Sequence, residues 1–460
     1  MTEADVVVIG AGPAGMAAAR TAAEAGASVV LLDEQAQPGG QIYRTIALAA
    51  GPRGAILGRD YVAGLELVAA IDHPSIRHVS SAVVWRVDAD GVVCFSVEGR
   101  AQRLRGRRLI LATGALERPV PVPGWTLPGV MTAGAAQILL KSSGIVPAEA
   151  VIAGSGPLLY LVAQQLVRAG RPPLALVETQ PAGGWVGAWR YWPGALRGWP
   201  VLAKGLRMLA RIRRAGVLRF TGASDIAIDG DERAEAIRFA AGGQSHRLAC
   251  RTVLLHQGVM PNVQVTRALR LDHAWDAAQR CFRPVVDGWG GTRLETVLVA
   301  GDGAGIAGAK AAALRGRLAA LQAVHGLGLV TSAARDDAAR PLRRSLAREL
   351  APRPFLDALY APPDAILRPA DDTIICRCEE VTAGDIRRHA ALGCLGPNQA
   401  KAFGRAGMGP CQGRYCGLTV TEILAAETGR TPAEVGYYRV RPPLKPVTLG
   451  ELADLHEPNP

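Results

Sequence analysis

The chain runs Asp5-Val-Val-Val-Ile-Gly10-Ala-Gly12-Pro-Ala-Gly15 near its N-terminus, and this stretch decides its fold. An apolar run ends in the pattern G-x-G-x-x-G, and an alanine-rich stretch of helical character follows. Gly10 permits a tight turn, Gly12 lets backbone approach a pyrophosphate, and Gly15 lets helix and strand pack closely. The positive end of the helix would face the phosphate charge. The stretch therefore predicts a strand, a phosphate-binding turn and a helix.

The next residues complete the unit. Val29–Leu32 is an apolar run that predicts a second buried strand, and Asp33 follows it directly. An acid about 20 residues after the glycines can accept hydrogen bonds from a ribose hydroxyl. A lone G-x-G-x-x-G is a weak signal, but strand, turn, helix, strand and acid in this order are specific. We expect a dinucleotide to bind here.

Two later stretches indicate which dinucleotide. Leu109-Ile-Leu-Ala-Thr113-Gly114-Ala115 and Thr296-Val-Leu-Val-Ala-Gly301-Asp302-Gly303 each predict a buried strand running into a turn, and a helix is expected from Ala304 to Ala320. These stretches resemble the signatures of flavoproteins with two dinucleotide-binding domains, the glutathione-reductase-like fold. The resemblance implies FAD, with Asp302 on the ribityl chain. Thr113 and Gly114 are also compatible with an ordinary turn at a strand end.

A second copy of the unit lies between these signatures. Ala150-Val-Ile-Ala-Gly154-Ser-Gly156-Pro-Leu-Leu159 again follows an apolar run, and Leu174–Glu178 resembles the second strand with its acid. Leu159 replaces the third glycine, so a side chain should push helix from strand or fill the groove. We expect a scaffold, or a site for another ligand, in preference to NAD(P) binding.

Four cysteines near the C-terminus form the pattern C-x-C…C-x₄-C: Cys376, Cys378, Cys411 and Cys416. Zinc sites usually need at least two residues between paired cysteines, so the C-x-C pair favours a 2Fe–2S cluster over zinc or unligated thiols. Residues 373–430, with glycines around both pairs, resemble the bacterioferritin-associated-ferredoxin-like 2Fe–2S domain. Cys394 lies between the pairs and is interpreted as a packing residue.

Two positions where disulfide reductases of this fold carry a redox cysteine pair have none here. They are Gly39-Gly-Gln-Ile-Tyr-Arg44 and Pro128-Gly-Val-Met-Thr-Ala-Gly134. No Ser-His-Asp arrangement and no histidine spacing typical of a metal site stands out, and His256 is interpreted as a surface or core residue. We therefore name no catalytic residue, and we expect a chain that moves electrons for a partner.

The combined motifs resemble the A subunit of opine (octopine or nopaline) oxidases almost end to end. They include Pro38-Gly-Gly-Gln-Ile-Tyr-Arg44, Ala112-Thr-Gly-Ala-Leu-Glu-Arg-Pro119 and Gly301–Gly308. Related chains occur in hydrogen cyanide synthase and in heteromeric proline, hydroxyproline and sarcosine dehydrogenases. The resemblance implies a B subunit, similar to D-amino-acid oxidase, that holds its own FAD and oxidises an opine or related secondary amine. It also implies an FMN at the subunit interface and a respiratory or quinone-type acceptor.

The resemblance also implies the site residues. The candidate FAD-binding residues are Gly10, Gly12, Pro13, Ala14, Gly15, Asp33, Glu34, Gly40, Gln41, Arg44, Val83, Ala112, Thr113, Gly114, Gly301 and Asp302. The candidate metal ligands are the four cysteines.

The motifs predict an α/β fold of the glutathione-reductase-like class with a small helical C-terminal domain. We expect a discontinuous FAD domain (1–118 and 256–325), an inserted nucleotide-binding-like domain (119–255), a proline-rich linker (326–372), the 2Fe–2S domain (373–430) and a tail (431–460). A stretch from Trp185 to Pro200 carries four tryptophans. Aromatic residues in such a stretch are usually packing residues, but an exposed group would suit a subunit interface, which we favour.

Composition excludes little. The net charge is +12, but aromatic residues make up only 5%, so nucleic-acid binding is not expected. No apolar run is long enough for a transmembrane helix, and the start of the chain leaves no room for a signal peptide. We expect a cytoplasmic protein with at most peripheral contact with the inner face of the membrane.

Two other functions stay open. One is a self-contained NAD(P)H-dependent reductase that passes electrons through the cluster, kept open by Gly154, Gly156 and Glu178. The other is a structural flavoprotein scaffold whose cysteines hold zinc.

Overall fold

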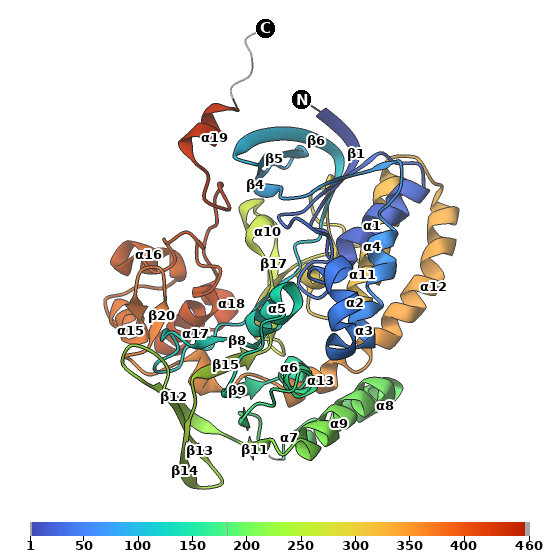
Figure 1. Cartoon of the computed structure of the whole chain (residues 1–460). Coiled ribbons are helices and arrows are strands. Elements are labelled where there is room, and N and C mark those ends of the chain that lie inside the picture. Colours follow the sequence, from blue (N-terminus) through green and yellow to red (C-terminus); the bar gives the residue numbers. More distant parts are fainter. Residues whose placement is uncertain (1, 182, 456–460) are drawn as a thin grey trace.

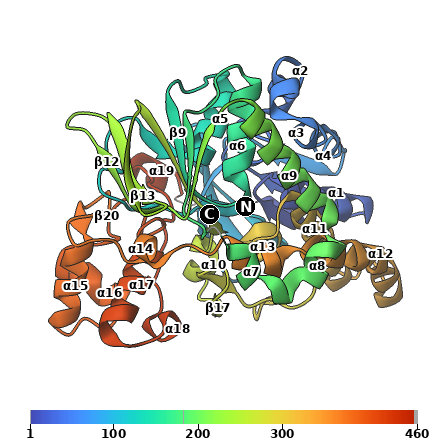
Figure 2. The ribbon, with the colours of Figure 1, turned by 90° about the horizontal axis from the view of Figure 1, so that it is seen from below.

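The structure is a computed structural model that describes residues 2–181 and 183–455. The chain forms three bodies (Figure 1): an N-terminal domain, an inserted domain and a C-terminal cysteine domain. In Figure 2 the cysteine domain lies at one side, and α11 (Ala309–Gly326) and α12 (Ser332–Leu350) lie at the other.

The N-terminal domain is built on a seven-stranded sheet in the order β3-β2-β1-β6-β5-β4, with β19 also paired to β6. The strands are β1 (Thr2–Ile9), β2 (Val29–Leu32), β3 (Ile76–Val79), β4 (Val83–Val87), β5 (Val92–Val97), β6 (Arg100–Leu111) and β19 (Val297–Val299). β1 pairs in parallel with β2, because the chain crosses between them through helix α1 (Pro13–Glu24), and it also pairs in parallel with β6.

Helix α1 packs against α11. Gly316 makes this possible, since a Cβ there would lie 2.0 Å from the carbonyl oxygen of Ala14. The helix expected from Ala304 to Ala320 begins later, at Ala309. Residues Gly301–Ala304 form a 3₁₀ turn, and one oxygen of Asp302 accepts hydrogen bonds from the N–H groups of Ala307 and Gly308 at 2.9 and 3.1 Å.

The inserted domain repeats the same arrangement. Its parallel sheet has the order β11-β10-β9-β15-β8. The strands are β8 (Val130–Thr132), β9 (Ala150–Ser155), β10 (Ala175–Glu178), β11 (Leu218–Thr221) and β15 (Thr252–Gln257). Its helices are α5 (Ala133–Ser143), α6 (Pro157–Arg168), α7 (Gly184–Gly187), α8 (Trp192–Arg197) and α9 (Trp199–Arg214). A three-stranded antiparallel sheet, β12 (Ser224–Asp229), β13 (Ala236–Ala241) and β14 (Gln244–Ala249), extends from it.

The chain passes twice between these two domains. The passing strands, β7 (Ala115–Glu117) and β16 (Val259–Pro261), pair antiparallel with each other. Remaining helices of the N-terminal domain are α2 (Ile46–Leu57), α3 (Arg59–Val62), α4 (Leu65–Ala69) and α10 (Gln264–Ala268), and β17 (His273–Asp276) pairs with β18 (Cys281–Pro284).

The segment 326–372, expected to be a linker, is largely helical. It contains α12, α13 (Arg353–Leu359) and α14 (Asp364–Leu367). Pro341 lies inside α12 without ending it, and Leu342 of α12 packs on Leu318 of α11. A high proline content therefore does not exclude helices in this segment, because packing of the apolar face of α12 outweighs the one backbone hydrogen bond lost at Pro341.

The cysteine domain contains β20 (Ile374–Cys376), β21 (Val381–Thr382), α15 (Ala383–Ala391), α16 (Pro397–Gly404), α17 (Gly417–Thr428) and α18 (Pro432–Val435). From there the tail runs back to the N-terminal domain, where α19 (Leu449–Ala453) lies near β6 (Figure 1). The last five residues of the tail expected at 431–460 lie outside the described residues.

Candidate functional site

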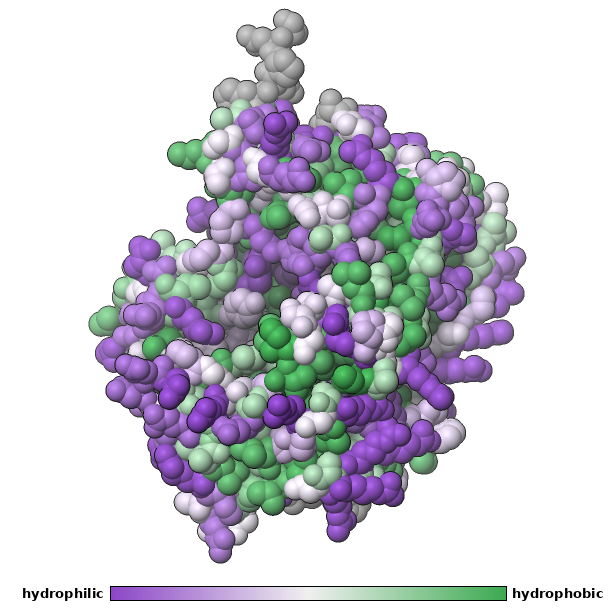
Figure 3. Space-filling view, in the orientation of Figure 1, coloured by the Kyte–Doolittle hydropathy of each residue, from purple (hydrophilic) through white to green (hydrophobic). Residues whose placement is uncertain are grey.

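A cavity of about 2060 Å³ lies where the three bodies meet. Its lining includes the glycine-rich turn after β1, residues of α5, α6 and α9, and all four cysteines of the C-terminal pattern. In the space-filling view the middle of the same face is hollowed (Figure 3). The cavity therefore connects the two sets of residues that the sequence singles out.

The glycines of the first turn have separate roles. Gly10 has a φ of +105°, and a Cβ at Gly15 would lie 1.7 Å from the carbonyl oxygen of Gly10. These two glycines are needed by the fold itself. A Cβ at Gly12 would instead meet only the Cα of Gly40, at 3.8 Å, and both Gly12 and Gly40 line the cavity. The protein leaves Gly12 open toward the cavity, as a pyrophosphate-binding position requires.

The two acids after β2 have different partners. Both oxygens of Asp33 accept backbone N–H groups, from Ala11 at 2.5 Å and from Gln35 at 2.8 Å, so this carboxylate braces the glycine turn. Burial raises the pKa of Asp33. Glu34 is more exposed and pairs with Lys445 from the C-terminal tail. Both acids line the cavity.

Most of the predicted FAD-binding residues line this cavity. The exceptions are Gly15, which packs α1 on β1, Gly301, which packs on Ala14, and Val83, whose neighbours Ala82 and Val84 line the cavity instead. The predicted residues that do line it are Gly10, Gly12, Pro13, Ala14, Asp33, Glu34, Gly40, Gln41, Arg44, Ala112, Thr113, Gly114 and Asp302.

Sequence reasoning missed a buried lysine. Lys141 of α5 is 2% exposed and lines the cavity, and its ammonium donates to the carbonyl oxygen of Gln41 at 3.0 Å and to Gln137 at 2.7 Å. Burial, with Arg44 nearby, lowers the pKa of Lys141 to about 7. A single lysine within an apolar helix is the only sequence signal, and it belongs to no motif.

The second nucleotide-binding-like unit has a buried core residue and a buried ion pair at two of its key positions. Leu159 is 1% exposed and packs in the core of the inserted domain. Glu178, the acid at the end of β10, is fully buried and accepts from Arg219 at 2.7 Å. Tyr160 accepts from Gln180 at 2.7 Å.

Tyr360, which follows α13, lies beside the same unit, since its ring is 6.3 Å from that of Tyr160. Gly154, Gly156 and Glu178 are not among the described residues that line the central cavity. One oxygen of the second unit's acid is therefore paired within the protein, and its glycine turn does not open into the central cavity among the described residues.

A histidine pairs with an acid where the chain passes between domains. His256 is buried, and its Nδ1 lies 2.5 Å from Oε1 of Glu117. The same carboxylate accepts the N–H of Gly134, in the first turn of α5, at 2.9 Å. From the sequence we interpret His256 as a surface or core residue, and the structure places it in the core. Its partner Glu117 lines the cavity.

The four cysteines form two pairs. The sulfurs of Cys378 and Cys411 lie 3.9 Å apart. Cys416 donates a hydrogen bond to Cys376, which is the main cause that lowers the pKa of Cys376 to about 6. Each pair takes one cysteine from C-x-C and one from C-x₄-C. Among the described residues, no three His, Cys, Asp or Glu side chains are arranged to hold one metal ion.

The glycines around the cysteines let the loop before α17 pack closely. A Cβ at Gly409 would lie 2.2 Å from that of Cys378, and one at Gly413 would lie 2.2 Å from the ring of Tyr438. Tyr438 is 1% exposed, and its hydroxyl faces Cys416 without a nitrogen or oxygen acceptor among the described residues. This hydroxyl can donate to the Cys416 sulfur, whereas the hydrogen bond with Cys376 and burial raise the pKa of the Cys416 thiol.

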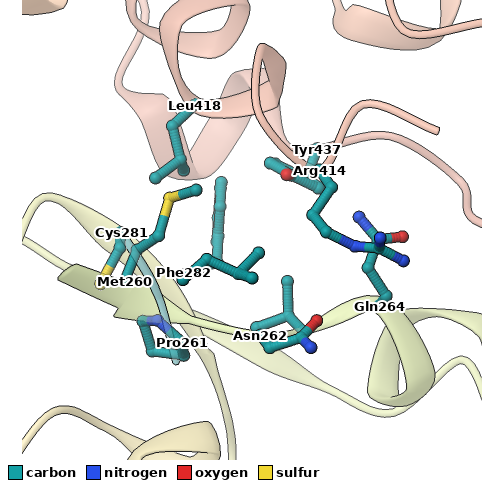
Figure 4. Close-up of a pocket in the computed structure, with 11 residues that line it drawn as sticks. Met260, Pro261, Asn262, Gln264, Cys281, Phe282, Arg414, Leu418 and Tyr437 are labelled. Atoms are coloured by element: carbon teal, nitrogen blue, oxygen red, sulfur yellow. The ribbon is translucent and has the colours of Figure 1, made fainter. Parts of the chain in front are cut away.

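Figure 4 shows how the cysteine domain is fixed to the N-terminal domain. Leu418 and Arg414 from the cysteine domain and Tyr437 from the start of the tail face Met260 and Phe282 across a small gap. The gap has a volume of about 10 Å³, which is about one water molecule. It is a seam between domains and too small for a cofactor.

An ion pair strengthens the same seam. Arg280 donates to both carboxylate oxygens of Glu422 in α17, at 2.9 and 2.5 Å. Glu422 is 3% exposed, so the pair is largely shielded from solvent.

Comparison with curated proteins finds relatives over nearly the whole chain. The A subunit of opine oxidase from Agrobacterium tumefaciens (strain Ach5) is 47% identical, covering 98% of this chain and 92% of the relative. This chain belongs to the opine oxidase A-subunit family. The HcnB subunit of hydrogen cyanide synthase from Pseudomonas protegens is 33% identical, covering 96% of each chain. The alpha subunit of sarcosine oxidase from Rhizobium meliloti is 28% identical, covering 98% of this chain and 42% of that protein.

Family comparisons match two regions. Residues 4–188 match the pyridine nucleotide-disulphide oxidoreductase family, and residues 371–455 match the sarcosine oxidase A3 domain. Among solved structures, L-proline dehydrogenase from P. horikoshii aligns with a TM-score of 0.72 at 19% identity, covering 98% of this chain and 79% of that one. Thioredoxin reductase from T. acidophilum aligns with a TM-score of 0.51 at 18% identity, covering 71% and 99%. The predicted fold class is confirmed.

The opine oxidase A-subunit family consists of oxidoreductase chains, so this chain is one component of a heteromeric flavoprotein oxidase. The predicted oxidoreductase class and the need for a second chain are confirmed at that level, and the matched family supports FAD as the dinucleotide. Within the described residues, no helix is long and apolar enough to cross a membrane.

Proposed function

We propose that this chain is the electron-transfer subunit of a heteromeric flavin and iron–sulfur amine dehydrogenase acting on an opine or a related secondary amine. Its partner is a B subunit, similar to D-amino-acid oxidase, that holds its own FAD and removes hydride from the amine carbon. The observation that carries the proposal is the shared cavity, because one space is lined by both the dinucleotide signatures and the four cysteines.

The first site suits FAD. Gly12 and Gly40 leave room for a pyrophosphate, the N-terminus of α1 begins at this turn, and Asp302 lines the cavity just before α11. A bound flavin supplies the ability to take up two electrons and release them one at a time. The protein's own residues contribute binding and a polar environment, in which Lys141 is a buried amine with a lowered pKa and Arg44 is a half-buried cation.

The cysteines suit a 2Fe–2S cluster better than zinc. One tetrahedral zinc needs four sulfurs around one point, whereas the thiols lie as two pairs. A cluster with two irons needs two thiolates for each iron. If metal binding removed the Cys416 proton, the buried Tyr438 hydroxyl beside it would donate to the thiolate.

The size of the cavity supports a second flavin at the subunit interface. Ligand pockets usually measure about 300–1000 Å³, and this cavity is about 2060 Å³. Beyond the FAD site its lining includes Arg168 of α6 and Lys204, Arg207 and Arg211 of α9. Several cations at the edge of a cavity suit a phosphate group, and FMN is our proposed ligand.

A self-contained NAD(P)H-dependent reductase is the alternative. It would need the second unit to bind a nicotinamide dinucleotide. Glu178 is instead paired with Arg219, and Tyr160 and Tyr360 lie against each other over the same unit. These contacts favour the function as one chain of a larger complex.

The test is to co-express this chain with its genomic neighbour, purify the complex and identify its cofactors. We expect FAD, FMN, iron and acid-labile sulfide, and an opine should bleach the flavin. Recovery of ADP or ATP in place of FAD would overturn the FAD assignment. Flavin reduction by NADH or NADPH within milliseconds would overturn the proposed function and favour the reductase.

A further inference from the structure

The chain between β10 and β11 carries an unusual surface. It comprises α7, the 3₁₀ turn Trp189–Tyr191, α8 and α9, and it lies at an edge of the molecule (Figures 1 and 2). One side is fixed by small residues. Ala188 and Ala195 are buried against Phe355 of α13, and a Cβ at Gly198 would lie 2.7 Å from Pro352. This contact determines which side of the segment faces solvent.

Large apolar side chains occupy the solvent side. Trp189 is 71% exposed, Trp199 61% and Leu206 68%, and Leu196 is exposed as well. Trp199 and Leu206 lie seven positions apart on α9, a spacing that keeps both on one side of that helix, while Trp189 and Leu196 lie on the 3₁₀ turn and on α8 before it. Single exposed apolar residues are common, but a series of them on one segment marks an interaction surface.

The same segment carries only positive charge. No Asp or Glu occurs between Glu178 and Asp225. Seven cations lie between Gly184 and Arg214: Arg190, Arg197, Lys204, Arg207, Arg211, Arg213 and Arg214. Lys204 pairs with Asp60 of α3, whereas Arg190, Arg197, Arg213 and Arg214 are exposed to solvent.

We propose that the α7–α9 segment binds the surface of an anionic lipid bilayer, with Trp189, Trp199 and Leu206 entering the headgroup region and exposed arginines contacting lipid phosphates. Tryptophan and arginine on one amphipathic segment are typical of helices that lie in the membrane interface. An anionic bilayer is negative throughout and attracts a segment that carries cations and no acids.

Binding of α9 to a bilayer would also bring the membrane near the central cavity. Lys204 and Arg207 of α9 line the cavity, so a bilayer beneath α9 would lie close to that side of it. An acceptor of the quinone class, dissolved in the bilayer, would then meet the protein next to its redox site. The membrane contact itself rests on the surface alone and does not depend on the proposed function.

The test uses the purified full-length chain with its bound cofactors and vesicles of phosphatidylcholine, with or without an equal part of phosphatidylglycerol. We expect sedimentation only with vesicles that contain phosphatidylglycerol, and weaker binding at high salt. Arg213→Gln with Arg214→Gln should weaken binding by about fivefold for each arginine. Trp199→Ser with Leu206→Ser should abolish it.

Matched changes elsewhere serve as controls. Arg439→Gln with Arg441→Gln and Leu449→Ser alter exposed residues of the tail, and they should leave vesicle binding unchanged. Absence of binding to anionic vesicles overturns the proposal. So does retention of vesicle binding in the α9 variants, and if those variants lose the B subunit instead, the segment is a protein interface. Flavin content and opine-dependent bleaching in the same samples report separately on the proposed function.

Discussion

Substituting two glycines of the same turn should affect different properties, FAD binding in one case and folding in the other. Gly12→Val should leave the protein folded but without FAD, because the added side chain enters the open cavity. Gly15→Val should prevent folding, since its Cβ would lie 1.7 Å from the carbonyl oxygen of Gly10. Asp302→Ala should weaken FAD binding by about 1–3 kcal/mol. Flavin absorbance and circular dichroism measure both properties, and a yellow Gly12→Val protein would contradict the assignment.

Because Lys141 is buried, we expect the free energy of unfolding to depend on pH in a specific way. Burial lowers its pKa to about 7 in the folded protein, and the unfolded chain has a lysine pKa of about 10.4. Between these values the unfolded chain binds a proton that the folded protein lacks. The lysine therefore makes the free energy of unfolding rise as pH increases from 7 to about 10, by at most about 1.4 kcal/mol per pH unit.

Lys141→Met should remove this rise. Urea unfolding of the nucleotide-free protein at several pH values from about 7 to about 10 measures it, with the exposed Lys310→Met as the matched control. If the stability difference between wild type and Lys141→Met is constant over this range, the lysine is not held neutral by burial.

At the scale of single elements, α6 tests how the second unit is used. Leu159 takes the place of the glycine that would let a dinucleotide unit pack closely, and it is buried in the core of the inserted domain. Leu159→Ala should therefore destabilise the protein by about 2–5 kcal/mol and should not create a site for NADH. Denaturant unfolding measures the first effect and NADH titration the second. Tight NADH binding by the variant would show that Leu159 alone blocks the site.

The four cysteines in strand β20, after it and in the loop before α17 are expected to hold a 2Fe–2S cluster. Dithionite-reduced protein should show a rhombic S = 1/2 EPR signal and contain two irons and two acid-labile sulfides. Changing any of Cys376, Cys378, Cys411 or Cys416 to Ser should abolish the signal. Cys394→Ser should retain it, because Cys394 is fully buried and its thiol faces the carbonyl oxygen of Gly396 at 3.4 Å. One zinc per chain without a reducible cluster would make the domain structural.

The same elements show what a sequence can predict. The first unit is predictable strand by strand, because its glycines, apolar runs and acid lie close together in the chain and their physical roles are local. Leu159 is recognisable as a departure from the pattern, but its neighbour Tyr160 meets Tyr360, which lies far along the chain. The helices of 326–372 and the role of Lys141 escape prediction for the same reason, since each depends on packing between distant segments.

At the scale of the molecule, the tail joins the cysteine domain to the nucleotide site. Tyr438 is buried beside Cys416, the N–H of Leu444 donates to the carbonyl oxygen of Trp85 at 2.7 Å, and Lys445 pairs with Glu34. Leu444→Ala with Lys445→Ala should release this connection and accelerate both proteolysis of the tail and loss of FAD. Leu449→Ala and Leu452→Ala, farther along, should change neither rate. Equal rates in all variants would mean that the tail does not secure the site.

The order in which the sheet strands occur in the chain also limits when the nucleotide site can form during synthesis. β6 ends at Leu111, but its neighbour β19 begins at Val297, after the entire inserted domain. A ribosome must therefore complete the inserted domain while one edge of the first sheet is still unpaired. Asp302 and α11 emerge only after that. FAD should be captured late in translation, and the part of β6 that pairs with β19 stays an open strand edge until then.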